Sequence, residues 1–419
     1  MSEQKKLVPK RRFKKFQDTS SWEQRRLSDL AKVSTGKAFS SADFSDDGEY
    51  LVVTNKNILD EENGITSVGD KIDISEEAIL NNYLLSGGNI LVTMDGVNIG
   101  KTGKYSNEKA VLAQRVGRLN SEQLEFVYQV TSDNKFISEM KKLSVGNAIK
   151  HISLKQIADY SFLAPISQEE QGGIGNFFNQ IDKTITLHQR KLEKTRALKS
   201  AYLSEMFPAE GACEPRRRFA GFTGAWEQRE LGEISDVRTG PFGSTLHAED
   251  YVEEGTPIIT TEHFKAGDLP EQKNGIPQVS DEDFLRLQSY VLATDDIVFS
   301  RVGSVDINAL VTPFQSGWLF SGRVLRVRTE NNIDSQYLHY ELSTSRAKND
   351  VIARAVGQTM PSINTEILKK TKVFIPTEIQ EQENIGQFLA SLDHLITLHQ
   401  RKLEKLQSIK KAYLNEMFV

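Results

Sequence analysis

The decapeptide Ile-Thr-Leu-His-Gln-Arg-Lys-Leu-Glu-Lys occupies residues 185–194 and recurs without a change at residues 396–405. The similarity extends on both sides of the decapeptide at the same offset of 211 residues, over residues 165–207 and 376–418. Chance does not produce a match of this length. The repeat therefore predicts a tandem duplication, with two structurally similar halves in one chain.

The two halves also open alike, because Trp-Glu-Gln-Arg at residues 22–25 returns at residues 226–229. Between these shared blocks, residues 37–145 and 241–356 have little in common beyond their spacing. Each half is thus predicted to be a variable globular segment followed by a shared helix. The expected segments are 1–165 and 209–376 for the globular parts, and 166–208 and 377–419 for the helices.

Length and composition set the outer limits on function. A chain of 419 residues and 47.2 kDa is too long for one ordinary domain. Its 52 basic and 57 acidic residues give a net charge of −5, which excludes a uniformly basic binder but not local basic patches. A single cysteine, Cys213, excludes a disulfide framework and a multi-cysteine metal site. With no long apolar run and no signal-like start, the expected compartment is the cytoplasm, away from membranes.

The shared segments are expected to form long helices. From Gln168 to Phe207 there is no proline, and Pro165 and Pro208 flank this run. Apolar residues recur in steps of three and four, which is typical of a coiled-coil seam. The residues expected to pair the helices are Ile181, Ile185, Leu192, Ile396, Leu403 and Leu406.

A helix with one apolar stripe needs a partner, and the simplest partner is the other copy. The residues alone allow parallel or antiparallel pairing. Each helix starts at the end of its own globular domain, which favours an antiparallel coiled coil with pseudo-twofold symmetry and a globular domain at each end. The outer faces repeat a set of cations, which suggests one kind of partner bound twice. These cations are Arg190, Lys191, Lys194, Arg401, Lys402 and Lys405.

The variable segments read as mixed α/β (α+β) domains. Short β-rich runs such as residues 89–93 and 296–300 alternate with turn residues, and helical stretches are expected near 121–142 and 334–355. Charge is segregated, because residues 43–77 hold most of the local acids. Glycine loops elsewhere carry cations and amides suited to phosphates and base edges. The candidate DNA-binding residues are Lys101, Lys104, Arg115, Lys150, Arg301, Ser304, Arg323, Arg354 and Gln358.

Catalytic motifs are not apparent in the sequence. The stretch Gly96–Thr102 looks like a phosphate-binding loop, but such a loop needs glycine where Asp95 stands and a helix after Thr102. The repeated His188 and His399 lie on the seam, where a packed histidine is more common than a catalytic base. The chain is therefore expected to be non-catalytic, without a metal site.

Taken together, these motifs resemble the specificity subunit (S subunit, HsdS) of type I restriction-modification enzymes. In the second half the resemblance is carried by Pro376, Glu381-Gln382, Ile385-Gly386, Asp393 and residues 398–404, each with its offset-211 partner in the first half. The openings at Trp22 and Trp226 and the stretch 297–303 also fit, although Met94 in the first half replaces Arg301 of the second. The resemblance covers essentially the whole chain.

The resemblance implies that each globular segment is a target-recognition domain that reads one half of a bipartite, asymmetric target in double-stranded DNA. The helices would set the spacing between the half-sites and dock two methyltransferase (M) subunits, and restriction (R) subunits would complete a host-defence complex. S-adenosylmethionine, ATP and magnesium would belong to those partners, with no cofactor in this chain. The alternative is a bivalent coiled-coil scaffold whose globular ends bind proteins instead of DNA.

Overall fold

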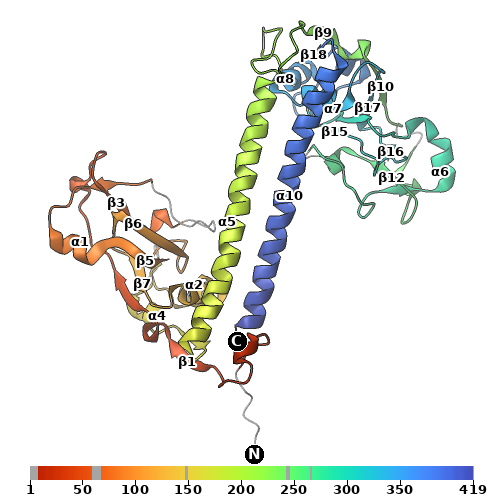
Figure 1. Cartoon of the computed structure of the whole chain (residues 1–419). Helices are drawn as coiled ribbons and strands as arrows, with labels where there is room; N and C mark the ends of the chain where they lie inside the picture. Colours follow the sequence, from red (N-terminus) through yellow and green to blue (C-terminus); the bar gives the residue numbers. More distant parts are fainter. Residues whose placement is uncertain (1–7, 59–67, 147–149, 242–245, 265–266, 419) are drawn as a thin grey trace, which may run out of the picture. The chain divides into compact units, whose positions relative to one another are not determined.

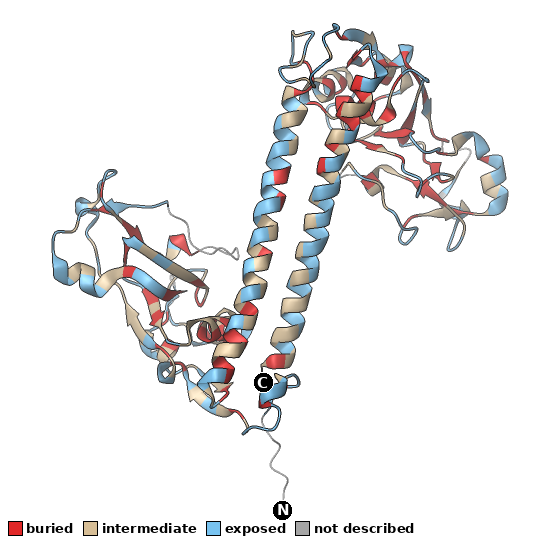
Figure 2. Ribbon diagram, in the orientation of Figure 1, coloured by how far each residue is buried: buried red, intermediate tan, exposed pale blue. Residues whose placement is uncertain are grey.

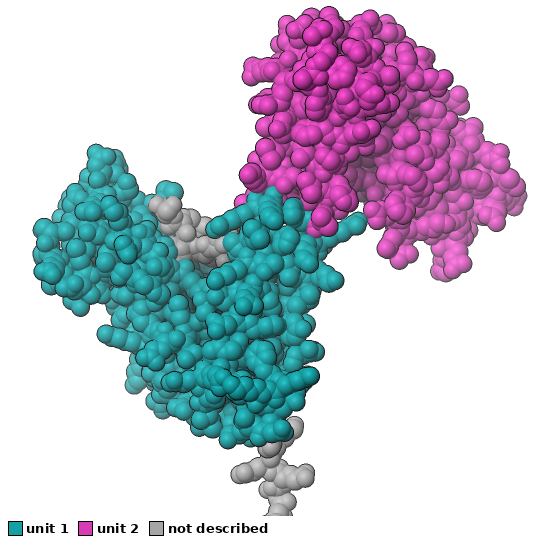
Figure 3. All heavy atoms as spheres, viewed as in Figure 1, with its two compact units in different colours: residues 1–191, 399–419 teal, residues 192–398 magenta. Residues whose placement is uncertain are grey.

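The computed structural model describes residues 8–58, 68–146, 150–241, 246–264 and 267–418. The chain divides into two compact units (Figure 3). Unit 1 comprises residues 1–191 and 399–419, and unit 2 comprises residues 192–398. Each unit therefore contains one end of each long helix.

The two long helices are present where the repeat predicts them (Figure 1). Helix α5 spans Gln168–Glu205 and helix α10 spans Ile379–Met417. Near the start of α5 the Ser167 hydroxyl accepts a 3.4 Å hydrogen bond from the Glu170 amide, and Glu169 and Glu170 place negative charge in the first turn. Both helices lie inside the predicted ranges 166–208 and 377–419.

The helices pack antiparallel within each unit. In unit 1 the Lys410 ammonium lies 2.6 Å from the carboxylate of Asp182, so the end of α10 meets the start of α5. In unit 2 the equivalent pair, Lys199 and Asp393, is separated by 2.5 Å. The antiparallel coiled coil expected from the sequence is thus confirmed.

Figure 2 shows buried, intermediate and exposed residues along both long helices. The predicted seam residues are buried to different extents. Ile185 is fully buried and Leu192 is 7% exposed, and both face the packed side of α5. The other four predicted residues are half-buried: Ile181, Ile396, Leu403 and Leu406.

Unit 1 is built on a six-stranded sheet in the order β2-β7-β5-β6-β3-β4. All neighbours in this sheet are antiparallel except β3 and β6. Its strands are β2 Lys32–Thr35, β3 Tyr50–Val53, β4 Lys71–Ile72, β5 Leu84–Thr93, β6 Thr102–Leu112 and β7 Val116–Asn120. Because β6 begins at Thr102, no helix follows the glycine loop before it, as expected.

Helices and a small second sheet complete unit 1. Strands β1 Glu23–Arg26 and β8 Ser161–Ala164 pair antiparallel. The helices are α1 Glu77–Tyr83, α2 Leu124–Ser132, α3 Asn134–Leu143 and α4 Leu154–Ala158. One core joins the sheet to α2, α3 and α4, and another joins α2 to both long helices.

Unit 2 repeats this plan with smaller sheets. One four-stranded sheet has the order β10-β17-β14-β15, a second has the order β11-β13-β12-β16, and β9 pairs with β18. The strands are β9 Glu227–Glu230, β10 Ser235–Thr239, β11 Tyr251–Val252, β12 Thr256–Ile259, β13 Gln278–Val279, β14 Ile297–Ser300, β15 Asn308–Leu310, β16 Leu319–Phe320, β17 Val324–Thr329 and β18 Lys372–Ile375. The helices are α6 Asp281–Arg286, α7 Ser335–Leu342, α8 Ser345–Arg354 and α9 Thr365–Lys369.

The two predicted helical stretches of the variable segments are each split in two. Asp133 separates α2 from α3, and its carboxylate accepts a hydrogen bond from the Lys135 amide as an N-cap. Thr344 separates α7 from α8 in the same way, with the Ala347 amide as donor. A side chain that caps a new helix thus ends the preceding one.

Among the described residues, none of the helices has the length and apolar content needed to cross a membrane.

Candidate nucleic-acid interface

Three loops are joined by backbone hydrogen bonds at one end of the central strands of the unit 1 sheet. The loop after β5 begins at Met94, whose amide donates to the carbonyl of Arg115 in the turn between β6 and β7. The Gly96 amide donates to the carbonyl of Lys150 at 3.1 Å, and the Ile152 amide donates to the carbonyl of Met94 at 2.8 Å. The segment around Lys150 is thereby tied to the loop after β5.

Unit 2 forms three equivalent bonds. The Arg301 amide donates to the carbonyl of Arg323 at 3.0 Å, the Gly303 amide to that of Pro361 at 2.9 Å, and the Ile363 amide to that of Arg301 at 2.9 Å. We call each set the loop cluster of its unit. The clusters comprise residues 94–101, 113–116, 145–146 and 150–152 in unit 1, and residues 301–307, 321–324 and 356–363 in unit 2.

A fourth segment, which contains Gly36 in unit 1 and Gly240 in unit 2, packs against each cluster at a position where any other residue would clash. A β-carbon on Gly36 would lie 2.0 Å from the carbonyl oxygen of Leu112, and one on Gly240 would lie 2.2 Å from that of Ser321. Such close backbone approach is open only to glycine. It brings Lys37, which forms a β-bridge with Ala113, beside the cluster of unit 1.

Most of the predicted DNA-binding residues meet in these clusters. Arg115 and Arg323 occupy the same turn in the two units, and Arg115 adopts a left-handed backbone with φ of 67°. Lys101 closes the loop after β5, and burial and the nearby Lys141 ammonium lower the pKa of its own ammonium. The residues that the loop clusters bring together are Lys101, Arg115 and Lys150 in unit 1, and Arg301, Ser304, Arg323 and Gln358 in unit 2.

The other two predicted residues lie outside the loop clusters. The Lys104 ammonium bonds to Glu125 at 2.7 Å and to Asn179 of α5 at 3.0 Å, so it connects the sheet to the long helix. Arg354 lies at the end of α8 and pairs with Asp350 one turn earlier. Within the cluster itself, the Arg301 guanidinium donates to the backbone carbonyls of Gly322 and Ile363, which stabilises the loops that surround it.

The cations predicted to dock a partner all lie on exposed parts of the helices. Each of Arg190, Lys191, Lys194, Arg401, Lys402 and Lys405 is exposed. Beside them, the equivalent residues Leu187 and Leu398 are 49% and 51% exposed. Each copy of the decapeptide therefore presents the same mixture of apolar and cationic side chains.

A short segment near the start of each half, residues 10–13 in unit 1 and 216–219 in unit 2, holds each unit together and was not expected from the sequence. We call this segment the arm. The Arg12 guanidinium donates to both carboxylate oxygens of Glu170, at 2.6 and 2.7 Å, and Arg218 does the same to Glu381 at 2.5 and 2.7 Å. The sequence feature that could have revealed the arm is the tripeptide Arg-Arg-Phe, which occurs at residues 11–13 and again at residues 217–219. The two copies are 206 residues apart, whereas the other repeated blocks are 204 and 211 residues apart, so this short repeat is easily overlooked.

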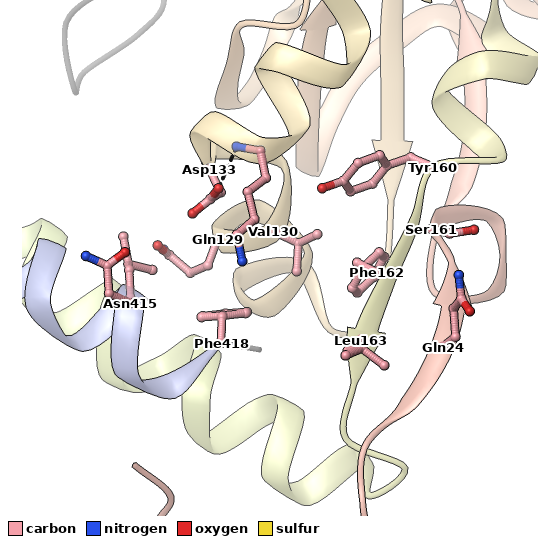
Figure 4. A pocket seen from close by; sticks show the side chains of 12 residues that line it. Gln24, Gln129, Val130, Asp133, Tyr160, Ser161, Phe162, Leu163, Asn415 and Phe418 are labelled. Atoms are coloured by element: carbon pink, nitrogen blue, oxygen red, sulfur yellow. Dashed lines mark hydrogen bonds between the residues drawn. The ribbon is translucent and has the colours of Figure 1, made fainter. Parts of the chain in front are cut away.

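Figure 4 shows a cavity whose lining residues lie outside the loop cluster of unit 1. Its volume is about 460 Å³, and it opens where Phe418 at the end of the chain meets α2 and strand β8. Tyr160 and Phe162 line one side, and Gln129, which is 1% exposed, lines another. Burial raises the pKa of Tyr160 to about 12, so its hydroxyl stays neutral at physiological pH. This cavity belongs to the packing of helix against sheet.

The described residues contain no group of three or more histidine, cysteine, aspartate or glutamate side chains placed to hold a metal ion. The seam histidines contact each other, with 3.0 Å between the Nδ1 atoms of His188 and His399. They pack in the helix pair, as the sequence indicates.

Two loop clusters held by equivalent backbone bonds, on two units that share a duplicated helix, give the chain a two-part architecture. The family model of the type I restriction modification DNA specificity domain matches residues 19–195 and again residues 224–408. The chain therefore belongs to the family of type I restriction-modification specificity subunits, which are recognition subunits and not enzymes in themselves.

Known relatives agree along most of the chain. The type I restriction enzyme MjaVIII specificity subunit of Methanocaldococcus jannaschii is 24% identical over 411 residues, which cover 94% of this chain and 91% of that protein. A putative MjaX specificity subunit of the same organism is 30% identical over 201 residues, covering 46% of this chain and 45% of that protein. The crystal structure of an S subunit from M. genitalium matches the fold with a TM-score of 0.67, at 16% identity and 99% coverage of both chains.

Proposed function

We propose that the two loop clusters each read one half of a bipartite, asymmetric DNA sequence. One observation carries this proposal: three equivalent backbone hydrogen bonds hold both clusters, while most side chains on them differ. The shared backbone arrangement would place the loops of both units in the same way against DNA. The side chains that differ between the two clusters would then select different bases. Arg115 and Arg323, which the two clusters share, are suited to a phosphate or guanine contact common to both half-sites.

The helices, in this proposal, dock two methyltransferase subunits and set the gap between the half-sites. The support is the repeated exposed surface around Leu187 and Leu398, with its six cations. An identical surface presented twice fits one kind of partner bound twice. S-adenosylmethionine, ATP and magnesium would then be held by the methyltransferase and restriction subunits, and the complex would act on DNA in the cytoplasm.

Methylation mapping tests the reading of two half-sites. The chain is coexpressed with its methyltransferase subunit, and the methylated sequence is determined across the host genome. Residues 37–145 are then replaced by the equivalent segment of another specificity subunit, and the mapping is repeated. We expect one half of the methylated sequence to change and the other half, with the gap, to stay the same.

The reciprocal replacement of residues 241–356 serves as the matched control, and should change only the other half. A change in both halves after a single replacement would contradict the model of two independent readers. Loss of methylation together with loss of the complex would show that the segment also contributes to assembly, and the reciprocal variant then tests the reading. Loss of methylation by an intact complex would contradict the exchange of a single half-site.

A further inference from the structure

Each loop cluster exposes large apolar side chains among its polar residues. In unit 1, Val97 is 91% exposed, more than any other large hydrophobic side chain among the described residues, and Val145 is 55% exposed. In unit 2, Val356 is 64% exposed and Met360 is 66% exposed. Single exposed apolar side chains are common on protein surfaces. Here two of them lie in each loop cluster, and such grouping is typical of a contact site for a ligand with an apolar surface.

The exposure of Val97 is fixed by the backbone. Gly96 and Gly100 on either side of it have φ of 79° and 82°, a conformation that favours glycine. The Gly96 amide is bonded to Lys150, and the Gly100 amide donates to the carbonyl of Thr93 at 2.9 Å. Val97 therefore stands at the tip of a loop that is pinned at both ends.

Met360 is presented in a comparable way. Val356 and Ser362 exchange two backbone hydrogen bonds of 2.9 Å, which closes the loop that carries Met360. Gly357 has φ of 103°, and a β-carbon on it would lie 2.8 Å from the carbonyl oxygen of Met360. The loop thus keeps this conformation only with glycine at residue 357.

The polar surroundings identify the ligand. Val97 is held between segments that carry Lys101, Lys150 and Arg115, and Met360 lies in the cluster of Arg301 and Arg323. Cations attract the phosphates of DNA, and the one apolar group on the edges of the bases in the major groove is the 5-methyl group of thymine. The proposed function places DNA at these loops, so the thymine methyl group is the apolar partner that agrees with the cations around it.

We infer that Val97 and Met360 are specificity-determining residues that contact thymine 5-methyl groups, one in each half-site. This inference rests on the proposed function. The position of Val97 corresponds to that of Ser304 in unit 2, where a hydroxyl replaces the apolar side chain. The thymine read by unit 1 therefore has no counterpart at the same place in the other half-site, where Ser304 favours a polar base edge.

Uracil substitution tests this contact, because it removes only the methyl group. Once the recognised sequence is mapped, duplexes are made in which each thymine of a half-site is replaced by deoxyuridine, one at a time. Binding of the complete complex with methyltransferase subunits is measured by fluorescence anisotropy. We expect one thymine in the half-site of unit 1 whose replacement weakens binding about four-fold, the equivalent of one buried methylene group.

The variant Val97→Ala should bind the thymine and uracil duplexes about equally, and Val97→Ser should do so as well. Met360→Ala should remove the methyl sensitivity of the other half-site alone. Val68→Ala and Leu285→Ala are the controls, because these residues are 82% and 66% exposed but lie outside the loop clusters. Both controls should keep the full sensitivity of the unsubstituted protein.

Several results would overturn the inference. One is a mapped half-site without any A·T pair. Another is that the unsubstituted complex binds every uracil duplex as tightly as the thymine duplex. A third is that the sensitivity to the thymine methyl group persists in the Val97→Ala and Met360→Ala variants. Each of these can occur while the complex still prefers its mapped sequence over random DNA. If that preference is itself missing, the proposed function fails, and the inference fails with it.

Discussion

Glu381 is 1% exposed, and both of its carboxylate oxygens accept hydrogen bonds from Arg218. The next residue in the shared motif, Gln382, donates from its side-chain amide to the carbonyl of Pro376 at 3.0 Å. Gln171 makes the same bond to Pro165 at 2.8 Å. The Glu-Gln pair of the repeat is therefore structural, since glutamate holds the arm and glutamine fastens the strand that leads into the helix.

The arm of unit 2 offers a test of this role. Arg218→Met leaves the buried carboxylate of Glu381 without its partner, which is expected to lower the free energy of unfolding by about 3–5 kcal/mol. Arg216→Met, two residues away on the exposed side of the same arm, should change it by less than about 0.5 kcal/mol. Thermal denaturation of the two variants checks the difference, and equal stabilities would contradict the role of the pair.

The histidine contact on the seam predicts a dependence of stability on pH. Burial lowers the pKa of His188, and the charges of His399, Lys191 and Lys402 lower it further. The unfolded chain therefore binds a proton at this histidine at a higher pH than the folded chain does. The stability associated with neutral His188 is fully present above about pH 6.5 and decreases as the pH falls below it. The midpoint of thermal unfolding should accordingly decrease between pH 6.5 and pH 5.

The double variant His188→Gln/His399→Gln isolates this effect. Burial lowers the pKa of His339 in unit 2 to about 4, so His339 also destabilises the fold in acid. His339 remains in the double variant, and the difference between the two pH profiles belongs to the seam pair alone. Parallel profiles over pH 5–8 would show that the pair contributes nothing.

At the scale of the element, a glycine in each long helix permits close packing on a shorter one. A β-carbon on Gly175 of α5 would lie 2.6 Å from the amide nitrogen of Phe126 in α2, and one on Gly386 of α10 would lie 3.0 Å from that of Tyr337 in α7. The Ile-Gly step of the repeat thus brings a helix backbone against the start of a second helix. Helix propensity alone would disfavour glycine inside these long helices.

Alanine substitution distinguishes packing from propensity. Gly175→Ala is expected to destabilise the chain by about 1–3 kcal/mol through overpacking. Gly172→Ala, one turn earlier, meets only the side-chain oxygen of Gln123 at 3.3 Å and should stabilise the helix by about 0.5–1 kcal/mol. Chemical denaturation of both variants gives the two signs. A gain for both would mean that α2 moves away at little cost.

Much of this element structure could be predicted from the sequence, and the exceptions have physical reasons. The long helices follow from an apolar period unbroken by proline, and this signal is local. The break at Asp133 was missed, because a cap depends on a backbone conformation that the apolar pattern does not report. The correspondence of Met94 with Arg301 is visible in the sequence, but the joining of the three loops in each unit is not, because backbone hydrogen bonds such as Gly96 to Lys150 do not depend on side-chain identity.

At the scale of the whole molecule, binding to DNA should depend steeply on salt despite the net charge of −5. The salt dependence is set by the cations in the loop clusters, not by the net charge of the chain. If they and their neighbours neutralise six or more phosphates, affinity should fall about 1,000-fold or more between 50 and 200 mM salt. Anisotropy titrations of the complex measure this slope. A flat dependence would favour the alternative of a scaffold that binds proteins.

The arms have a further consequence for the order of the chain. In unit 1 the Arg11 amide donates to the carbonyl of Glu416 at 2.8 Å, and in unit 2 the Arg217 amide donates to that of Glu205 at 2.9 Å. The second contact lies within one continuous stretch of polypeptide, whereas the first joins residues from opposite regions of the sequence. The peptide chain is therefore continuous across the junction of unit 2, whereas non-covalent contacts hold the equivalent junction of unit 1. The packing at a junction therefore does not require a continuous chain across it.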